Sequence, residues 1–177
     1  MAKSCLGIDI GKDQLKLVLM KGENIVKTAS VQMPEGLLKD GRIVSVETTG
    51  ELIRKTMKEN KIRCKEAAVV VSSGICFLRN VTMPEMTAEQ LVYNLPYEFR
   101  DYITDELKKY VFDYSWGSGE EMPKGKKLKK ASKKKKKEEK PEEEENQKRN
   151  ETELLAAAAP LEVMDDLRLM TRKAGLK

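Results

Sequence analysis

The chain has 177 residues, of which 40% are hydrophobic, so it can form one ordinary domain or two small ones. It contains no histidine, which excludes Ser-His-Asp and Cys-His triads, histidine-ligated zinc and a histidine pH switch. The three cysteines share no CxxC spacing, so we expect reduced, buried thiols rather than a disulfide framework or a thiolate metal cage. Because there is no signal-peptide pattern and no stretch of roughly 20 apolar residues, we expect a soluble, cytoplasmic protein.

The positive charge is concentrated in residues 124–150. This segment has 13 lysines and arginines against 6 glutamates, an excess of seven, whereas the whole chain carries +5, so the rest of the chain carries −2. The segment has almost no apolar side chains to bury, so we predict that it is disordered. Its lysine run, Lys133 to Lys137, is typical of a solvated linker. Nucleic-acid binding is the weaker interpretation because no aromatic residues are interleaved, and attachment to an anionic membrane surface stays open.

The N-terminal region predicts a sheet with one crossover helix. Apolar and polar residues alternate over 5–10, 15–20 and 25–33, with short polar turns between them, which predicts a β-meander. After a loop and a short element over 42–46, a helix is predicted to begin at Thr48. Its inward side is expected to carry Leu52, Ile53, Thr56, Met57 and Asn60. The apolar run 67–71 then predicts a strand buried on both faces that returns to the first sheet.

A second unit is predicted to begin near Gly74. It has a strand over 75–83, a helix from the capping box Thr87 to Gln90 through about 103, and strands over 109–116 and 152–159. Pro96 should kink or shorten this helix. A final helix is expected with Pro160 as its first residue, Gly175 as its C-terminal cap, and an inward stripe of Leu161, Met164, Leu167 and Met170 or Thr171. The fold class is therefore α/β with a mixed sheet.

The second predicted helix has aromatic and acidic side chains that invite a functional interpretation. Its aromatic residues have helical spacing, which favours core packing over a cofactor site: Tyr93, Tyr97, Phe99 and Tyr102. The dispersed acids of the same region are interpreted as a solvated face: Glu85, Glu89, Glu98, Asp101, Asp105 and Glu106. The adjacent Asp165 and Asp166 point to different sides of a helix, so they do not form a general acid/base pair.

The most specific local motif is Asp9-x-Gly11-x-x-x-x-Lys16, at the first hairpin turn. Glycine lets turn N–H groups converge on an anion, a carboxylate at a strand end can hold a hydrated divalent cation, and lysine adds a positive charge. These are the parts of a phosphate and Mg²⁺ site. Aspartate and glycine are also ordinary hairpin-turn residues, and the pattern alone favours this second interpretation.

Four segments together resemble a known family: LGIDIGKDQLKLVLMKG, VTMPEMTAEQLVYNLPYEFRDYI, KYVFDYSW and LLAAAAPLEVMDDLRLMTRKAGLK. They are similar to the type IV pilus assembly PilM family, which is actin-like and related to FtsA. The resemblance implies that the motif is a phosphate loop for ATP and Mg²⁺. In it Asp9 would lie near the metal, the backbone of Gly11, Lys12 and Asp13 would line the phosphates, and Lys16 would match the family's lysine. Lys12 departs from the small hydroxyl residue that the family has after the glycine.

The resemblance also implies a domain organisation. Residues 1–73 would form the actin-like, ribonuclease H-like subdomain 1A. Residues 74–159 would form an SHS2-type subdomain 1C that contains the segment 124–150, and residues 160–177 would return to 1A as a helix. Complete relatives continue with a second lobe, so the chain corresponds to their N-terminal half. Because actin-type sites act from both lobes, we expect no appreciable ATPase from this chain alone.

The leading functional hypothesis is a scaffold. By resemblance, the chain would be a cytoplasmic component of type IV pilus or related secretion assembly, peripheral to the inner membrane. It would bind the cytoplasmic tail of a PilN-like inner-membrane protein in a groove between 1A and 1C and connect it to the assembly ATPase complex. The first alternative is an FtsA-like filament protein that self-associates through 1C. The second is a polyanion-binding protein that acts through Lys133 to Lys137.

Overall fold

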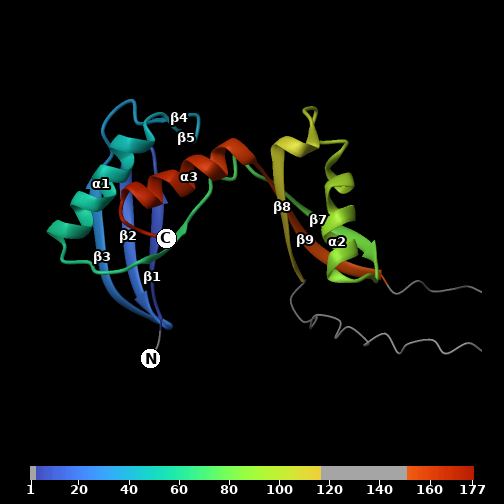
Figure 1. Ribbon diagram of the computed structural model, residues 1–177, viewed down its shortest axis with the longest axis horizontal. Helices are drawn as coiled ribbons and strands as arrows, with labels where there is room; N and C mark the ends of the chain where they lie inside the picture. The colour runs from blue at the N-terminus through green and yellow to red at the C-terminus, as the bar shows by residue number, and fades with distance from the viewer. Residues whose placement is uncertain (1–2, 117–150) are drawn as a thin grey trace, which may run out of the picture.

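The computed structural model describes residues 3–116 and 151–177, and the predicted linker 124–150 lies outside the described residues. The described chain forms two three-dimensional units (Figure 1). The first unit is the sheet β3-β2-β1-β6 with the helices α1 and α3, and the second unit is the sheet β7-β9-β8 with the helices α2, η1 and η2. Each unit has its own cluster of buried hydrophobic side chains.

The first sheet is built from a meander and one crossover. Strands β1 (Ser4–Ile10), β2 (Gln14–Lys21) and β3 (Asn24–Gln32) are antiparallel, and α1 (Val46–Glu59) leads to β6 (Glu66–Val69), which lies parallel to β1. A short hairpin of β4 (Leu38–Lys39) and β5 (Arg42–Ile43) precedes α1. The predicted meander and crossover are therefore confirmed.

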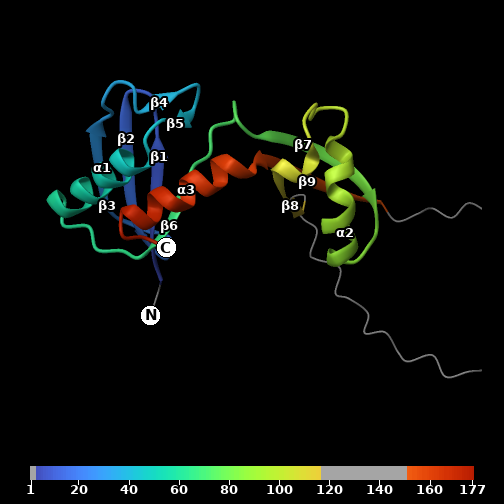
Figure 2. The ribbon, with the colours of Figure 1, turned by 45° about the horizontal axis from the view of Figure 1, so that its top comes forward.

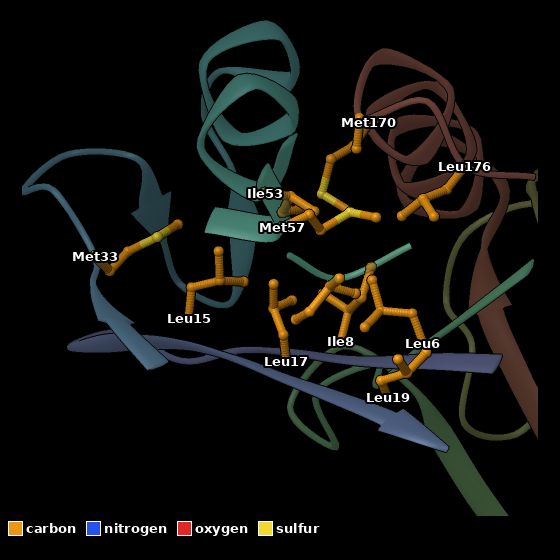
Figure 3. Close-up of a cluster of buried hydrophobic side chains, with 12 residues drawn as sticks. Leu6, Ile8, Leu15, Leu17, Leu19, Met33, Ile53, Met57, Met170 and Leu176 are labelled. Carbon is orange, nitrogen blue, oxygen red and sulfur yellow. The ribbon is translucent and has the colours of Figure 1, made fainter. Parts of the chain in front are cut away.

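The core of the first unit lies between this sheet and two helices. Alternate residues of β1 and β2 point to one face, where α1 and α3 (Leu161–Lys173) cover them (Figure 3). The buried side chains that meet there include Leu6, Ile8, Leu15, Leu17, Ile53, Met57 and Met170. The helices pack closely at Gly50, where a Cβ would lie 2.7 Å from Lys173 Cβ and 2.9 Å from the Met170 carbonyl oxygen. Only glycine fits this helix crossing without displacing α3.

Three details of the predicted helices differ from the structure. Helix α1 begins at Val46 and not at Thr48, because the Ser45 Oγ caps the helix by accepting a bond from the Thr48 N–H at 3.3 Å. Asn60 is exposed rather than inward, and its side-chain amide donates to the Thr56 carbonyl. Pro160 is the N-cap of α3 rather than its first residue. Consequently the inward stripe of α3 is shifted, and Val163 is buried in place of Leu161.

The prediction of a strand buried on both faces at 67–71 is wrong. Strand β6 ends at Val69 and lies at the edge of the sheet, and the side chain of Val70 is 62% exposed. The helices cover one face of this sheet, so the other face of an apolar edge strand stays open. Among residues 3–116 and 151–177, pairing on the outer edge of β6 occurs only at its start. There the Ala67 N–H donates to the Lys177 carbonyl at 3.2 Å and the Lys177 N–H donates to the Lys65 carbonyl at 2.7 Å.

The second unit is a three-stranded antiparallel sheet with helices on one face. Its strands are β7 (Phe77–Pro84), β8 (Tyr110–Trp116) and the central β9 (Glu151–Pro160). The alanines of β9 form a strand despite their helix propensity, because Ala158 lies opposite both Phe77 and Phe112 and leaves room for their rings. Phe99 is fully buried, with its ring 5.5 Å from that of Phe112.

The predicted helix over 87–103 is shortened, as expected from Pro96. The capping box of Thr87 and Gln90 starts α2 (Ala88–Asn94), and a 3-10 helix, η1 (Leu95–Phe99), follows with the proline in its first turn. A short turn, η2 (Leu107–Lys109), precedes β8. Figure 2 shows that β9 continues into α3, so the two units are joined by this connection and by the segment between β6 and β7.

Candidate functional site

The predicted motif lies on the turn between β1 and β2. Asp9 and Lys16 are opposite each other in the strand pairing, and the Lys16 Nζ lies 3.7 Å from an Asp9 carboxylate oxygen. Gly11 begins the turn, and its N–H donates to the Gln14 carbonyl at 3.0 Å. A Cβ at Gly11 would lie 2.9 Å from this carbonyl oxygen, so the turn itself requires glycine. The hairpin therefore brings Asp9, Gly11 and Lys16 together.

The free donors of this turn are the next two backbone amides. Within the described residues, no acceptor is bonded to the N–H of Lys12 or of Asp13, whereas the Asp13 carbonyl accepts from Met33 at 2.8 Å. Two amides and one lysine suit a single phosphate group. No group of three or more acidic, cysteine or histidine side chains that could hold a metal ion occurs in the part of the chain that the structure describes. At this turn the Asp9 carboxylate is paired with Lys16, and Asp13 carries a second, exposed carboxylate.

A second candidate site lies where the two units are joined. A pocket with a volume of about 430 Å³ including its open mouth is bounded by the end of β1, the β4-β5 hairpin, the segment after β6 and the first turns of α3. Its apolar lining consists of Ile10, Leu38, Ile43, Val70, Val71, Ile75, Val163 and Leu167. Arg42 and Asp166 are its charged lining residues. We call this feature the junction pocket.

Arg42 connects the junction pocket to a second hollow. Its guanidinium lies 3.7 Å from the Glu162 carboxylate of α3, and both residues line this hollow together with Tyr110 and Leu161. Glu162 and Arg42 are well exposed, so this ion pair contributes little to stability. It does place one cation and one anion beside the apolar pocket.

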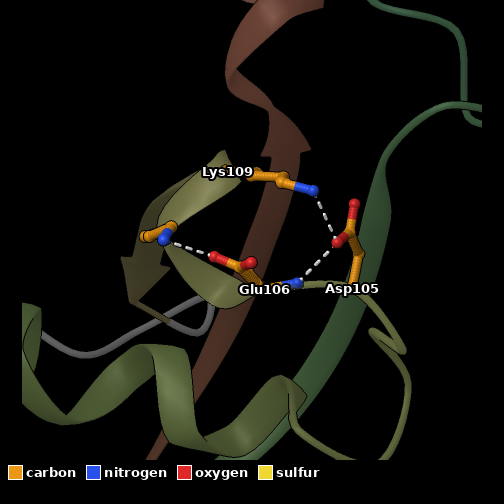
Figure 4. A network of polar contacts seen from close by, with 4 residues as sticks. Asp105, Glu106 and Lys109 are labelled. Atoms are coloured by element: carbon orange, nitrogen blue, oxygen red, sulfur yellow. Dashed lines mark hydrogen bonds and ion pairs between the residues drawn. The ribbon is translucent and has the colours of Figure 1, made fainter.

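A small polar network borders the second hollow (Figure 4). The Asp105 carboxylate accepts a bond from the Lys109 ammonium at 2.9 Å and another from the Glu106 N–H at 2.8 Å. The bond from Lys109 and then the bond from Glu106 hold the pKa of Asp105 below its ordinary value. The same bond to Asp105 raises the pKa of Lys109.

We expect an acid-side loss of this contact. The folded-state pKa of Asp105 lies below its ordinary value of 3.8. The stabilisation that the ionised Asp105 gives the folded chain is therefore complete above pH 3.8 and is lost as the pH falls through the folded-state pKa. An NMR titration of the Asp105 carboxyl carbon should show the lowered pKa, and Lys109→Ala should raise it. Lys108→Ala is the matched control, since Lys108 pairs with Glu106. An Asp105 pKa that is the same in Lys109→Ala as in the unmodified chain would contradict this assignment.

The predicted core role of the aromatic residues is correct for Phe99 alone. Tyr93 is 72% exposed, and Tyr97 and Tyr102 are also exposed. The reason is that the helix ends at Asn94, so the spacing of three to four residues no longer keeps these side chains on one face. Arg79 and Arg100 stack on the rings of Tyr102 and Tyr97, at 3.7 and 4.5 Å from the ring centroids. The predicted solvated acids are exposed apart from Glu98, which is half-buried.

The cysteines are less buried than predicted. Cys5, Cys64 and Cys76 are free thiols, and each is half-buried rather than fully buried. Burial raises the pKa of the Cys76 thiol, which disfavours a reactive thiolate at this position. Asp165 pairs with Arg168 at 2.9 Å, while Asp166 lines the junction pocket, so the two adjacent carboxylates point to different surroundings as predicted.

Comparison with known proteins identifies the family. The sequence model of the type IV pilus assembly protein PilM matches residues 7–148. The chain belongs to the PilM family. No curated protein sequence matches it.

Two solved structures have a similar fold to this PilM-family chain. One is a PilM-PilN type IV pilus biogenesis complex, with 22% identity, a TM-score of 0.74, and coverage of 97% of this chain and 45% of that one. The other is the cytoplasmic domain of EpsL, an inner-membrane component of the type II secretion system of Vibrio cholerae, with 11% identity, a TM-score of 0.54, and coverage of 98% and 54%. The predicted mixed α/β, actin-like fold of PilM is confirmed. The chain spans about half the length of these structures.

No helix among residues 3–116 and 151–177 is long and apolar enough to cross a membrane. The junction pocket was not identified from the sequence, because its residues come from four separate segments. The available indication was that Val71 and Ile75 are apolar although they lie in a connection between strands.

Proposed function

We propose that this PilM-family chain is a cytoplasmic scaffold that binds the tail of a PilN-like inner-membrane protein in the junction pocket. The family assignment and the solved PilM-PilN complex support the choice of partner. In this proposal the first unit corresponds to subdomain 1A and the second unit to the SHS2-type subdomain 1C. The chain would then lie at the inner membrane through its partner, where it would connect the partner to the assembly ATPase complex.

The observation on which the proposal depends is the composition of the junction pocket. Eight apolar side chains line it, and two opposite charges, Arg42 and Asp166, are set among them. An extended peptide presents alternate side chains to a surface, so apolar side chains can enter such a pocket while backbone groups reach the charged residues. Such a small apolar pocket suits individual aliphatic side chains of a peptide and not a folded domain.

A binding measurement tests the pocket assignment. We expect Leu167→Arg to weaken binding of the fluorescein-labelled cytoplasmic tail of the cognate PilN-like protein at least thirtyfold, measured by fluorescence anisotropy. The reason is that Leu167 lines the pocket, where the long, charged arginine side chain would occupy the space for an apolar side chain of the tail. Leu169→Arg is the matched control, because Leu169 is exposed on the same helix and does not line the pocket.

The two variants together decide the interpretation. Unchanged tail binding in Leu167→Arg would place the tail elsewhere and refute the pocket assignment. Equal losses in both variants would show a general effect on α3 rather than a local one. Circular dichroism melts of both variants establish that the chain remains folded during the binding measurement.

We further propose a weak nucleotide contact at the first hairpin turn. The free amides of Lys12 and Asp13 and the Lys16 ammonium would hold one phosphate group of ATP, and Asp9 would bind the accompanying Mg²⁺ through water. Bound Mg²⁺ would neutralise phosphate charge. The Gly11 N–H is already bonded to Gln14, so glycine serves the shape of the turn in this proposal.

A further inference from the structure

A hollow lined by basic residues lies at the opposite end of the first sheet from the hairpin turn of Gly11. It is formed by the start of β1, the connection between α1 and β6, and Gly175 after α3. The charged residues that line it are Lys3, Arg63, Lys65 and Glu66. Its volume is about 1020 Å³ including the open mouth, and it shares no residue with the junction pocket.

The local sequence explains why cations gather here. In the connection between α1 and β6, apolar residues alternate with basic ones. Ile62 is buried, and the Cys64 Sγ donates to the Ser4 carbonyl at 3.3 Å and to the Glu66 carbonyl at 3.2 Å. Because Ile62 and Cys64 point inward, the alternate residues Arg63 and Lys65 are both exposed. Along an extended chain the Cα atoms of Arg63 and Lys65 are roughly 6.6 Å apart.

The side chains around the hollow carry more positive charge than negative charge. Lys21 of β2 is opposite Ser4 in the strand pairing, and Ser4 lines the hollow. The one acidic residue in the lining, Glu66, lies 3.9 Å from the Lys3 ammonium. Neither Lys21, Arg63 nor Lys65 forms an ion pair with any residue in the described ranges. Three cations, Lys3, Arg63 and Lys65, therefore share the lining of the hollow with one carboxylate.

We propose that this hollow binds a phosphate-bearing ligand, with the Arg63 guanidinium and the ammonium groups of Lys65 and Lys3 as its contacts. Arginine presents paired N–H donors to phosphate oxygens, and the two lysines add compact positive charge. The site is separate from the hairpin turn and from the junction pocket, so it goes beyond the proposed scaffold function. The phosphate can come from a phospholipid headgroup or from a free phosphate compound.

A charge-matched pair of variants of the full chain tests the proposal. We expect the double variant Arg63→Glu and Lys65→Glu to weaken sedimentation with vesicles containing 30% phosphatidylglycerol at least tenfold. The control is Arg54→Glu with Lys39→Glu, which has the same net charge and replaces exposed residues outside the hollow. We expect the control to change binding less than threefold. The lysine-rich segment is identical in both proteins, so their difference reports the hollow alone.

A second arm distinguishes the sources of phosphate. Pyrophosphate is titrated into the labelled full chain, and we expect NMR shifts of the Arg63 and Lys65 amides that are absent in Arg63→Gln with Lys65→Gln. A selective vesicle effect assigns a phospholipid headgroup, and a pyrophosphate effect without a vesicle effect assigns a free phosphate compound. The proposal is overturned if the hollow variant and the control bind vesicles alike and pyrophosphate also causes no shifts that Arg63→Gln with Lys65→Gln abolishes.

Discussion

Phe99→Ala should lower the free energy of unfolding of the second unit by about 3–5 kcal/mol, which is the usual cost of deleting a fully buried aromatic ring. Phe99 has no exposed surface and packs against Phe112 of β8. Ala156 and Ala158 of β9 belong to the same buried cluster and are too small to fill the space that the ring would leave. Since a domain of this size has a total stability of 5–15 kcal/mol, the variant should lose much of the second sheet's stability.

Amide hydrogen exchange shows where the stability is lost. The buried clusters of the two units share no residue, so we expect Phe99→Ala to reduce protection in β9 while β1 keeps most of its protection. Tyr93→Ala is the control, because its ring is largely exposed and its loss should change stability by less than about 0.5 kcal/mol. Equal loss of protection in both sheets would contradict two separate cores.

Ile8→Ala should cost the first unit about 2–5 kcal/mol. Ile8 is fully buried in β1, between β2 and β6, and packs beneath α1 and α3. Because Asp9 and the hairpin turn follow it directly, the same change should broaden the NMR signals of Lys12 and Asp13. A less stable core also holds α3 less firmly against the sheet, and α3 lines the junction pocket.

Thermal or urea unfolding followed by circular dichroism measures this cost. Ile25→Ala is the matched control, since Ile25 is an exposed isoleucine on β3 of the same sheet. We expect the control to change stability by less than about 0.5 kcal/mol. Similar values for the two variants would mean that the sheet does not pack under α1 and α3 as described.

Periodicity and turn chemistry predicted most elements of both units. Alternation located β1, β2 and β3, and the capping box located α2, because these patterns arise from interactions between residues close in sequence. Exposure was harder to predict. The sequence patterns predicted that Val70 and Tyr93 are buried, but both side chains are exposed in the fold. Whether another element covers such a residue depends on contacts between distant segments, which no local pattern reveals.

The candidate sites also differ in how well the sequence could predict them. Asp9, Gly11 and Lys16 could be recognised because one hairpin brings them together. The junction pocket depends on how α3 crosses the first sheet after a long excursion through the second unit, so Val71 and Leu167 become neighbours only in the fold. The basic hollow likewise combines the first strand with the connection before β6.

The most direct test of the scaffold account is an NMR measurement of contact between the junction pocket and the partner's tail. The chain is labelled at isoleucine and leucine methyl groups, and the unlabelled PilN-like tail peptide is added. The account predicts intermolecular nuclear Overhauser effects from Ile43, Ile75 and Leu167, which line the pocket, and none from the exposed Ile25 and Leu169. Contacts confined to Ile25, Leu169 or the second unit would contradict it.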